Sequence, residues 1–280
     1  MTLAGGRSQT RVAFDDRVRG ALERAKAAER AGLICYLPAG YPNLEISEAC
    51  LRAAAESGAD LLEVGFPFSD PVMDGPIIQA ANQTALDQGM TVDDELALCA
   101  RLTAAVEVPT LVMTYFTIPA ARGLDTFAAD AASAGLAGAI LPDLPADEAG
   151  EWLGHARARG LSTVFLAAPT SRDARLDAIV AVSSGFVYAT SVLGVTGVRD
   201  ALADARQLVE RIRKRTPLPV AVGIGVSNPR QAREVAGYAD GVIVGSALVR
   251  TAGTGDPKDA PRRVAELVEA LRAGVEGARR

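Results

Sequence analysis

The sequence has few cysteine, histidine and aromatic residues, and it carries no excess of positive charge. It contains three cysteines, one histidine and 5% aromatic residues, with 29 Lys and Arg against 34 Asp and Glu. So few cysteines exclude a disulfide framework, and with one histidine they argue against a metal site. The net charge of -5 offers no field to attract nucleic acid or an acidic membrane. We therefore expect no metal, no cofactor, no nucleic-acid partner and no membrane association.

Long apolar segments are also missing from the sequence. No run approaches the roughly 20 residues that a membrane span needs. The opening segment MTLAGGRSQTRVAFDDR lacks the apolar core of a signal peptide. These two observations predict a cytoplasmic protein.

Eight short runs rich in Val, Ile and Leu alternate with longer, Ala-rich and charged stretches. The runs begin at Leu33, Asp60, Thr110, Gly138, Thr163, Phe186, Pro219 and Gly241. This alternation is typical of parallel strands connected by helices. It predicts a single (β/α)8 TIM barrel over residues 1–280, with residues 1–12 as a flexible tail and an added helix within residues 15–32. A doubly wound open sheet is the alternative.

Two of the intervals between runs are longer than one strand-and-helix unit needs. They follow the second run and the sixth run, before Thr110 and before Pro219. In a barrel this extra length would form long loops on the face that carries the catalytic residues. We therefore look for the active site at these two positions.

The second run and the segment after it, LLEVGFPFSDPVMDGPIIQAA, contain three carboxylates. Glu63 lies in an otherwise apolar strand, where burial raises proton affinity and suits a carboxyl group to general acid and base catalysis. A structural ion pair with a buried cation is the alternative for Glu63. Asp70 and Asp74 follow in a loop rich in proline and glycine, where each is either a second functional carboxylate or a turn former.

Glycine-rich turns follow the last two predicted strands. Gly225 lies in VGIGVSNP, and Gly245 and Ser246 lie in GVIVGSALV. In TIM barrels, backbone N–H groups of the turns after strands seven and eight commonly bind phosphate. We therefore expect Gly225, Gly245 and Ser246 to form a phosphate site.

The segment EVGFPFSDPVMDGPIIQAA resembles the signature of the tryptophan synthase α subunit family. LPDLP, SVLGVTG, GIGVSNP and VGSALV follow in the family's order, so the resemblance extends from Leu33 to Arg250. It implies retro-aldol cleavage of indole-3-glycerol phosphate to indole and glyceraldehyde 3-phosphate in tryptophan biosynthesis. Glu63 would be the general acid and base, and Asp74 would accept the indole N–H. The resemblance also implies Tyr188 and Thr196 as substrate-binding residues and Gly197, Gly225, Gly245 and Ser246 as phosphate-binding residues.

The sequence departs from the family pattern after the third predicted strand. Thr117 stands where the family usually has Asn, and the following proline is displaced to Pro119. In the family this loop faces a β subunit, so two hypotheses stay open. The chain is either the α subunit of an α2β2 complex or a stand-alone lyase that releases indole for specialised metabolism. A phosphosugar isomerase and an inert activating subunit are further alternatives, and the presence of both Glu63 and Asp74 argues against the inert subunit.

Overall fold

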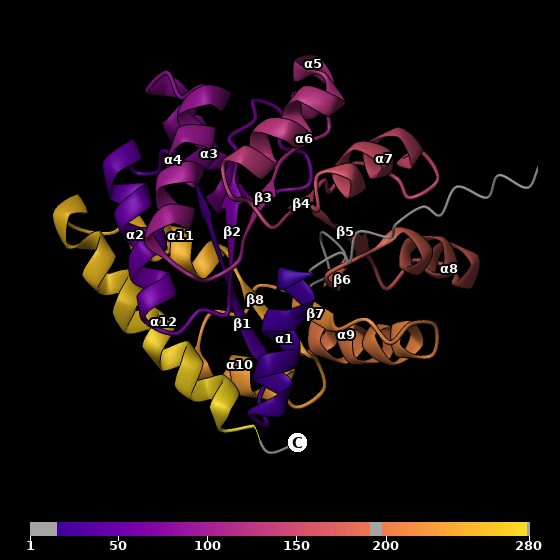
Figure 1. Cartoon of the computed structure of the whole chain (residues 1–280). Coiled ribbons are helices and arrows are strands. Elements are labelled where there is room, and N and C mark those ends of the chain that lie inside the picture. Colours follow the sequence, from indigo (N-terminus) through magenta and orange to yellow (C-terminus); the bar gives the residue numbers. More distant parts are fainter. Residues whose placement is uncertain (1–15, 191–197, 279–280) are drawn as a thin grey trace, which may run out of the picture.

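Eight parallel strands close into a barrel at the centre of the protein. The computed structural model describes residues 16–190 and 198–278, and its helices surround the strands (Figure 1). The strands are β1 (Gly32–Pro38), β2 (Leu61–Gly65), β3 (Thr110–Met113), β4 (Gly138–Ile140), β5 (Ser162–Ala167), β6 (Val187–Thr190), β7 (Val220–Gly223) and β8 (Gly241–Val244). Each predicted run overlaps one strand, and β8 pairs with β1. The barrel prediction is confirmed, and the open-sheet alternative is wrong.

Two apolar layers stabilise the barrel. Successive side chains of a strand point alternately into the barrel and outward to the helices. The inner layer is a buried cluster with one residue from each of seven strands, and with Phe186 from the position directly before β6. The seven strand residues are Ile34, Leu61, Leu111, Ile140, Val164, Ala221 and Ile243. Glu63 is two positions beyond Leu61, so the same alternation directs its side chain to the inside, closer to the carboxyl end of β2.

The helices cover the outside of the strands. They are α1 (Arg17–Ala27), α2 (Leu44–Glu56), α3 (Pro76–Asp87), α4 (Val92–Ala105), α5 (Thr117–Arg122), α6 (Leu124–Ser133), α7 (Gly150–Ala158), α8 (Asp173–Val182), α9 (Val198–Arg213), α10 (Pro229–Ala236), α11 (Ser246–Ala252) and α12 (Ala260–Glu276). Asn43 caps α2, because its side chain accepts a hydrogen bond from the backbone N–H of Ile46. Gly135, with φ of +75°, follows α6 in a left-handed conformation that glycine adopts without strain.

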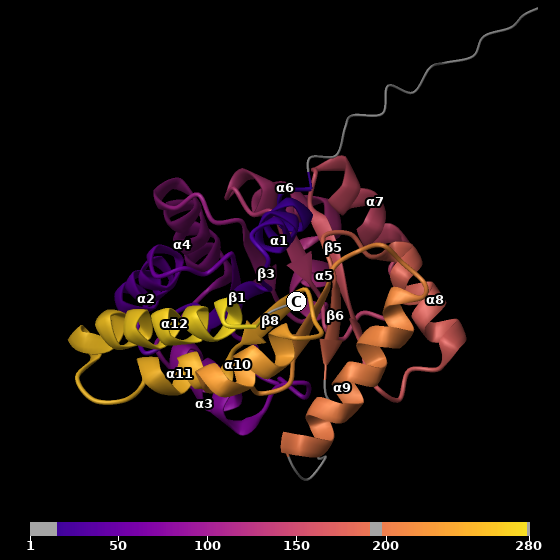
Figure 2. The same ribbon diagram turned by 90° about the horizontal axis from the view of Figure 1, so that it is seen from below.

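The predicted added helix is α1, and it closes the amino-terminal end of the barrel. Figure 2 shows α1 at one end and α3 near the other. Leu22 is buried and packs against Gly32 and Gly241, where a Cβ atom would approach its side chain to 2.4 Å and 3.4 Å. The Asp16 carboxylate caps α1 and accepts hydrogen bonds from the Gly185 N–H and the Ser162 hydroxyl. The open end of the barrel is therefore the carboxyl end of the strands.

The prediction of a long loop after β2 is only partly correct, because much of the extra sequence there is helical. It forms residues 66–75 and then a complete helix, α3, before α4 completes the unit. After β6, residues 191–197 lie outside the described residues, as do residues 1–12 with the predicted tail. Within residues 16–190 and 198–278, no helix is both long and apolar enough to cross a membrane.

Candidate active site

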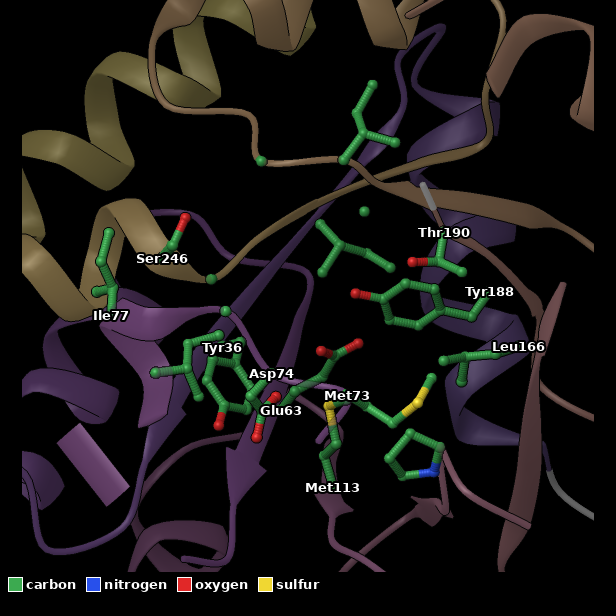
Figure 3. Close-up of a pocket in the computed structure, with 18 of the residues that line it drawn as sticks. Tyr36, Glu63, Met73, Asp74, Ile77, Met113, Leu166, Tyr188, Thr190 and Ser246 are labelled. Carbon is green, nitrogen blue, oxygen red and sulfur yellow. The ribbon is translucent and has the colours of Figure 1, made fainter. Parts of the chain in front are cut away.

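A cavity of about 540 Å³ opens at the carboxyl ends of the strands. All eight strands, or the loops directly after them, contribute to its lining. Its lining includes the predicted site residues Glu63, Asp74, Tyr188, Gly225, Gly245 and Ser246. Figure 3 labels Glu63, Asp74, Tyr188 and Ser246 among them. Thr196 and Gly197 lie outside the described residues. Residues separated by more than 180 positions in the sequence therefore share one site.

Glu63 is fully buried on β2 and faces this cavity. It lies in register with Tyr36 on β1 and Leu111 on β3. Within the described part of the chain, neither carboxylate oxygen has a hydrogen-bond partner, and no ion pair includes Glu63. The alternative of a structural ion pair thus finds no cation among these residues. Burial raises the pKa of Glu63 to about 8, so the carboxyl group is mostly protonated at neutral pH.

Asp74 enters the same cavity from the loop between β2 and α3. Its carboxylate accepts a hydrogen bond from the Asn82 side chain at 3.4 Å and one from the Tyr115 hydroxyl. Burial raises the pKa of Asp74 to about 6, and these two hydrogen bonds limit the rise because they favour the ionised form. Gln79 donates to the Asp74 carbonyl oxygen at 2.9 Å, which ties the loop to the first turns of α3.

The structure separates Asp74 from the other loop carboxylate. Asp70 is exposed, accepts a hydrogen bond from the neighbouring Ser69 hydroxyl, and does not line the cavity. The Asp70 carboxylate therefore contributes to the local turn, whereas Asp74 reaches the site.

Tyr115 contacts the Asp74 loop, and the sequence pattern did not predict this contact. It follows β3 and is buried, and its ring stacks on Phe68 with centroids 5.0 Å apart and planes at 22°. Its hydroxyl accepts a hydrogen bond of 2.9 Å from the Met73 N–H. The available signal was its position directly after a predicted strand, where parallel barrels place their active-site residues.

Two tyrosines line the cavity, and each hydroxyl lies over a glycine of a neighbouring strand. A Cβ atom on Gly65 would lie 2.3 Å from the Tyr36 hydroxyl, and one on Gly223 would lie 2.3 Å from the Tyr188 hydroxyl. Any other residue at these glycines would displace the rings, so the glycines make room for tyrosines to point into the site. Tyr188 was implied by the family resemblance, whereas Tyr36 was missed.

The predicted phosphate turns lie on the side of the cavity formed by β7 and β8. Gly225 has φ of +81°, which favours glycine, and Ser246 is the first residue of α11. The first N–H groups of a helix have no acceptor inside it and are free to bind an anion. Among the described lining residues there is no Lys, Arg or His. An anion here would therefore be bound by backbone N–H groups and the Ser246 hydroxyl.

The described residues also contain no group of three or more His, Cys, Asp or Glu side chains placed to hold a metal ion. Cys35, Cys50 and Cys99 are buried free thiols, and burial raises the pKa of Cys50 to about 12. These thiols are protonated at neutral pH, and none lines the cavity. The titratable groups that remain in the site are carboxyl and phenol groups.

Comparison with known proteins gives one consistent family. The family model described as "Tryptophan synthase alpha chain" matches residues 22–276. The tryptophan synthase alpha chain of Streptomyces avermitilis is 51% identical over 230 residues, which are 82% of this chain and 83% of that protein. That of Thermobifida fusca is 47% identical over 268 residues, 94% of this chain and 99% of the relative.

Solved structures agree with the sequence comparison. A structure of Mycobacterium tuberculosis tryptophan synthase superposes with a TM-score of 0.87 at 44% identity and covers 93% of this chain and 98% of its own. A chain of the tryptophan synthase complex from Pyrococcus furiosus superposes with a TM-score of 0.80 at 34% identity, with 87% and 98% covered. Fold and sequence thus point to the same relatives.

Proposed function

The chain belongs to the tryptophan synthase alpha chain family, and from this premise we propose how its residues divide the chemistry. The reaction is the cleavage of indole-3-glycerol phosphate to indole and glyceraldehyde 3-phosphate, a lyase reaction of tryptophan biosynthesis. The observation that carries the assignment is that two carboxyl groups of different proton affinity, Glu63 and Asp74, face one cavity. Between about pH 6 and pH 8, Glu63 is mostly protonated and Asp74 mostly ionised.

Glu63 moves the protons of the cleavage. Its carboxyl group donates a proton to C3 of the indole, and the resulting carboxylate takes the proton of the side-chain hydroxyl next to the ring. The electron pair of that O–H bond becomes the new carbonyl bond, and the bond between C3 and the side chain breaks. The electrons of the broken bond return to the ring, which leaves neutral indole, an aldehyde and a reprotonated Glu63.

Asp74 stabilises the charge that this protonation creates. Protonation at C3 places positive charge on the ring nitrogen. An ionised Asp74 accepts a hydrogen bond from the indole N–H and stabilises that charge. The hydrogen bonds from Asn82 and Tyr115 support this role because they favour the ionised carboxylate and fix its direction. Glu63 and Asp74 therefore carry opposite proton states for separate tasks.

The remaining site residues bind the rest of the substrate. The backbone N–H groups of Gly225, Gly245 and Ser246 hold the phosphate, and the Tyr188 ring contacts the substrate beside Glu63. The family resemblance adds Thr196 and Gly197 to the substrate and phosphate sites. Local N–H groups are suited to this task because the chain has a net charge of -5 and no general attraction for anions.

We also propose that the chain works with a β subunit. Related solved structures are tryptophan synthases, and that from Pyrococcus furiosus is described as a complex. The most exposed large apolar side chains of the described residues are Val72 and Met73, 73% and 40% exposed, directly before Asp74. A partner that covers this loop would act on the catalytic carboxylate next to it. Nothing in the comparisons favours a stand-alone lyase. A cytoplasmic location stays a prediction that cell fractionation checks.

The test is indole release from indole-3-glycerol phosphate by the purified chain, with and without an added tryptophan synthase β subunit. We expect indole release that rises at least tenfold with the partner. Glu63→Gln should abolish release in both conditions. Absence of indole in both conditions for the unsubstituted chain would overturn the assigned reaction, and full activity without the partner would overturn the partnership alone.

A further inference from the structure

Tyr36 is a buried residue of the cavity that the proposed chemistry does not use. It lies on β1 and is only 5% exposed, yet it lines the cavity together with both carboxylates. Within residues 16–190 and 198–278, its hydroxyl makes no hydrogen bond. Because Tyr36 lines the cavity, its hydroxyl is available to bond with a group that enters or lines that cavity.

The ring of Tyr36 is held by packing that would equally suit phenylalanine. A Cβ atom on Gly245 would lie 3.3 Å from Cδ1 of the ring, and one on Gly65 would lie 2.7 Å from the ring carbons Cε2 and Cζ. The ring thus fills the space between β2 and β8. The hydroxyl lies over Gly65, 2.3 Å from the position of a Cβ atom there. The position of the ring therefore fixes the direction of the hydroxyl, although the packing of the ring does not require a hydroxyl.

The hydroxyl faces acidic groups. After burial, the groups that oppose ionisation of Tyr36 are, in order of size, Asp74, Glu63, Tyr115 and Tyr188, and no cation is among them. Burial and these acidic neighbours raise the pKa of Tyr36 well above its ordinary value, so the group stays protonated and can donate a hydrogen bond. Figure 3 shows Tyr36 on the side of the cavity where Asp74 lies, with Tyr188 on the other side.

We propose that Tyr36 is a positioning residue for the cleavage: when substrate fills the cavity, its hydroxyl donates to the Asp74 carboxylate and holds that group ionised against the indole N–H. This inference rests on the proposed function. Substrate displaces the water around Asp74, which favours the uncharged carboxyl group. Asn82 and Tyr115 already donate to this carboxylate in the free chain. A third donor offsets the additional loss of water.

Tyr36→Phe tests the proposal because it keeps the ring and removes only the hydroxyl. The variant and the unsubstituted full-length chain are compared with saturating β subunit, and kcat and kcat/KM for indole release are measured from pH 5 to pH 9. The acidic limb of kcat reports the occupied site, and that of kcat/KM reports the free chain. We expect the variant to shift the kcat limb upward by about half to one pH unit, with little change in the kcat/KM limb. An unmoved kcat limb, or an equal loss at every pH, would overturn the proposal.

A binding measurement separates this role from direct contact with the substrate. Indole-3-propanol phosphate keeps the indole and the phosphate but lacks the side-chain hydroxyls, so it cannot be cleaved. If Tyr36 acts through Asp74, Tyr36→Phe binds this probe several-fold more weakly near pH 6.5, and the difference disappears near pH 8. A loss of affinity that is equal at all pH values would mean direct contact with the ligand and would contradict the proposal.

Tyr41→Phe is the matched control. The Tyr41 hydroxyl also lies over a glycine, Gly253, but Tyr41 does not line the cavity. We expect this variant to keep both pH profiles, and the thermal unfolding midpoint should show that each variant is folded. If the unsubstituted chain releases no indole, the proposed function fails. If it is active and Tyr36→Phe leaves the kcat limb in place, only the role of Tyr36 fails.

Discussion

The hydroxyl oxygen of Tyr115 accepts a hydrogen bond of 2.9 Å from the backbone N–H of Met73, 42 residues earlier in the chain. The same hydroxyl donates to the carboxylate of Asp74, the next residue in that loop. The stacked Tyr115 and Phe68 rings hold the hydroxyl in place. One side chain at the end of β3 therefore fixes both the backbone of the catalytic loop and the direction of its carboxylate.

Removing the Tyr115 hydroxyl should weaken catalysis mainly on the acidic side. Tyr115→Phe removes a hydrogen bond to a charged group, a loss of about 1.5–3 kcal/mol, so kcat/KM at pH 7 should fall about tenfold or more. The pKa of Asp74 should rise above about 6, and the acidic limb of kcat/KM should move up with it. Tyr238→Phe is the control because Tyr238 does not line the cavity, and an unshifted limb in Tyr115→Phe would contradict this assignment.

The pH dependence of the unsubstituted chain should be bell-shaped. Activity should rise through about pH 6 as Asp74 ionises and fall through about pH 8 as Glu63 loses its proton. These are apparent values of two groups in one site. The substrate phosphate also titrates at about pH 6. Binding of indole-3-propanol phosphate to Asp74→Asn is therefore measured over the same pH range, because this variant lacks the Asp74 carboxylate and shows the contribution of the phosphate alone. A flat profile from pH 5 to pH 9 would be incompatible with the division of roles between the two carboxyl groups.

Glu63→Gln should be inactive and, above neutral pH, more stable than the unsubstituted chain. The folded chain binds the Glu63 proton more tightly than the unfolded chain, because burial raises the pKa from 4.5 to about 8. Stability is therefore lost as pH rises from 4.5 and the loss levels off above 8. Glutamine has no charge to bury, so its unfolding free energy at pH 8 should be higher by roughly 4 kcal/mol, with almost no gain at pH 4.5. Urea unfolding at both pH values measures this, and equal stability at pH 8 would show that Glu63 is not desolvated.

Gly223→Ala should disturb the site through the Tyr188 ring. The new methyl group would lie 2.3 Å from the hydroxyl and 2.7 Å from two ring carbons, so the ring must move. We expect a loss of about 1–3 kcal/mol in unfolding free energy and a lower kcat/KM. Gly154→Ala is the matched control, because Gly154 lies inside α7 and the new methyl group would contact nothing beyond the neighbouring residues and backbone of its own helix. That change should be neutral or slightly stabilising, since alanine favours helices. Unchanged activity in Gly223→Ala would show that the Tyr188 ring has no fixed place in the reaction.

The barrel and one of the two carboxyl groups of the site, Glu63, could be predicted from local sequence patterns. Each strand is an apolar run between charged helices, and Glu63 is conspicuous because a carboxylate interrupts such a run. Its partner Asp74 was harder to separate from Asp70, since both lie in one Pro- and Gly-rich loop. Only the folded loop places Asp70 in solvent and Asp74 against Asn82 and Tyr115.

Local sequence patterns did not identify Tyr36 and Tyr115, for a different reason. A tyrosine in or after an apolar strand reads as an ordinary core residue, and its function depends on which glycine or loop lies across from it. Gly65 is opposite Tyr36 only because β1 and β2 pair in one register, with Tyr36 beside Glu63. Such pairings between strands are long-range consequences of the fold, and residue spacing does not encode them.

The closure of the barrel by α1 has a consequence for how the protein forms. Asp16 accepts a hydrogen bond from the Gly185 N–H, across 169 residues of sequence. During synthesis, α1 is the earliest of the described helices to emerge but among the last to dock, because its acceptor site belongs to the turn before β6. Until Gly185 has been made, Leu22 has no barrel end to cover, and the apolar face of α1 stays exposed. At this end of the molecule, α1 is synthesised before the strands that it covers but docks after them.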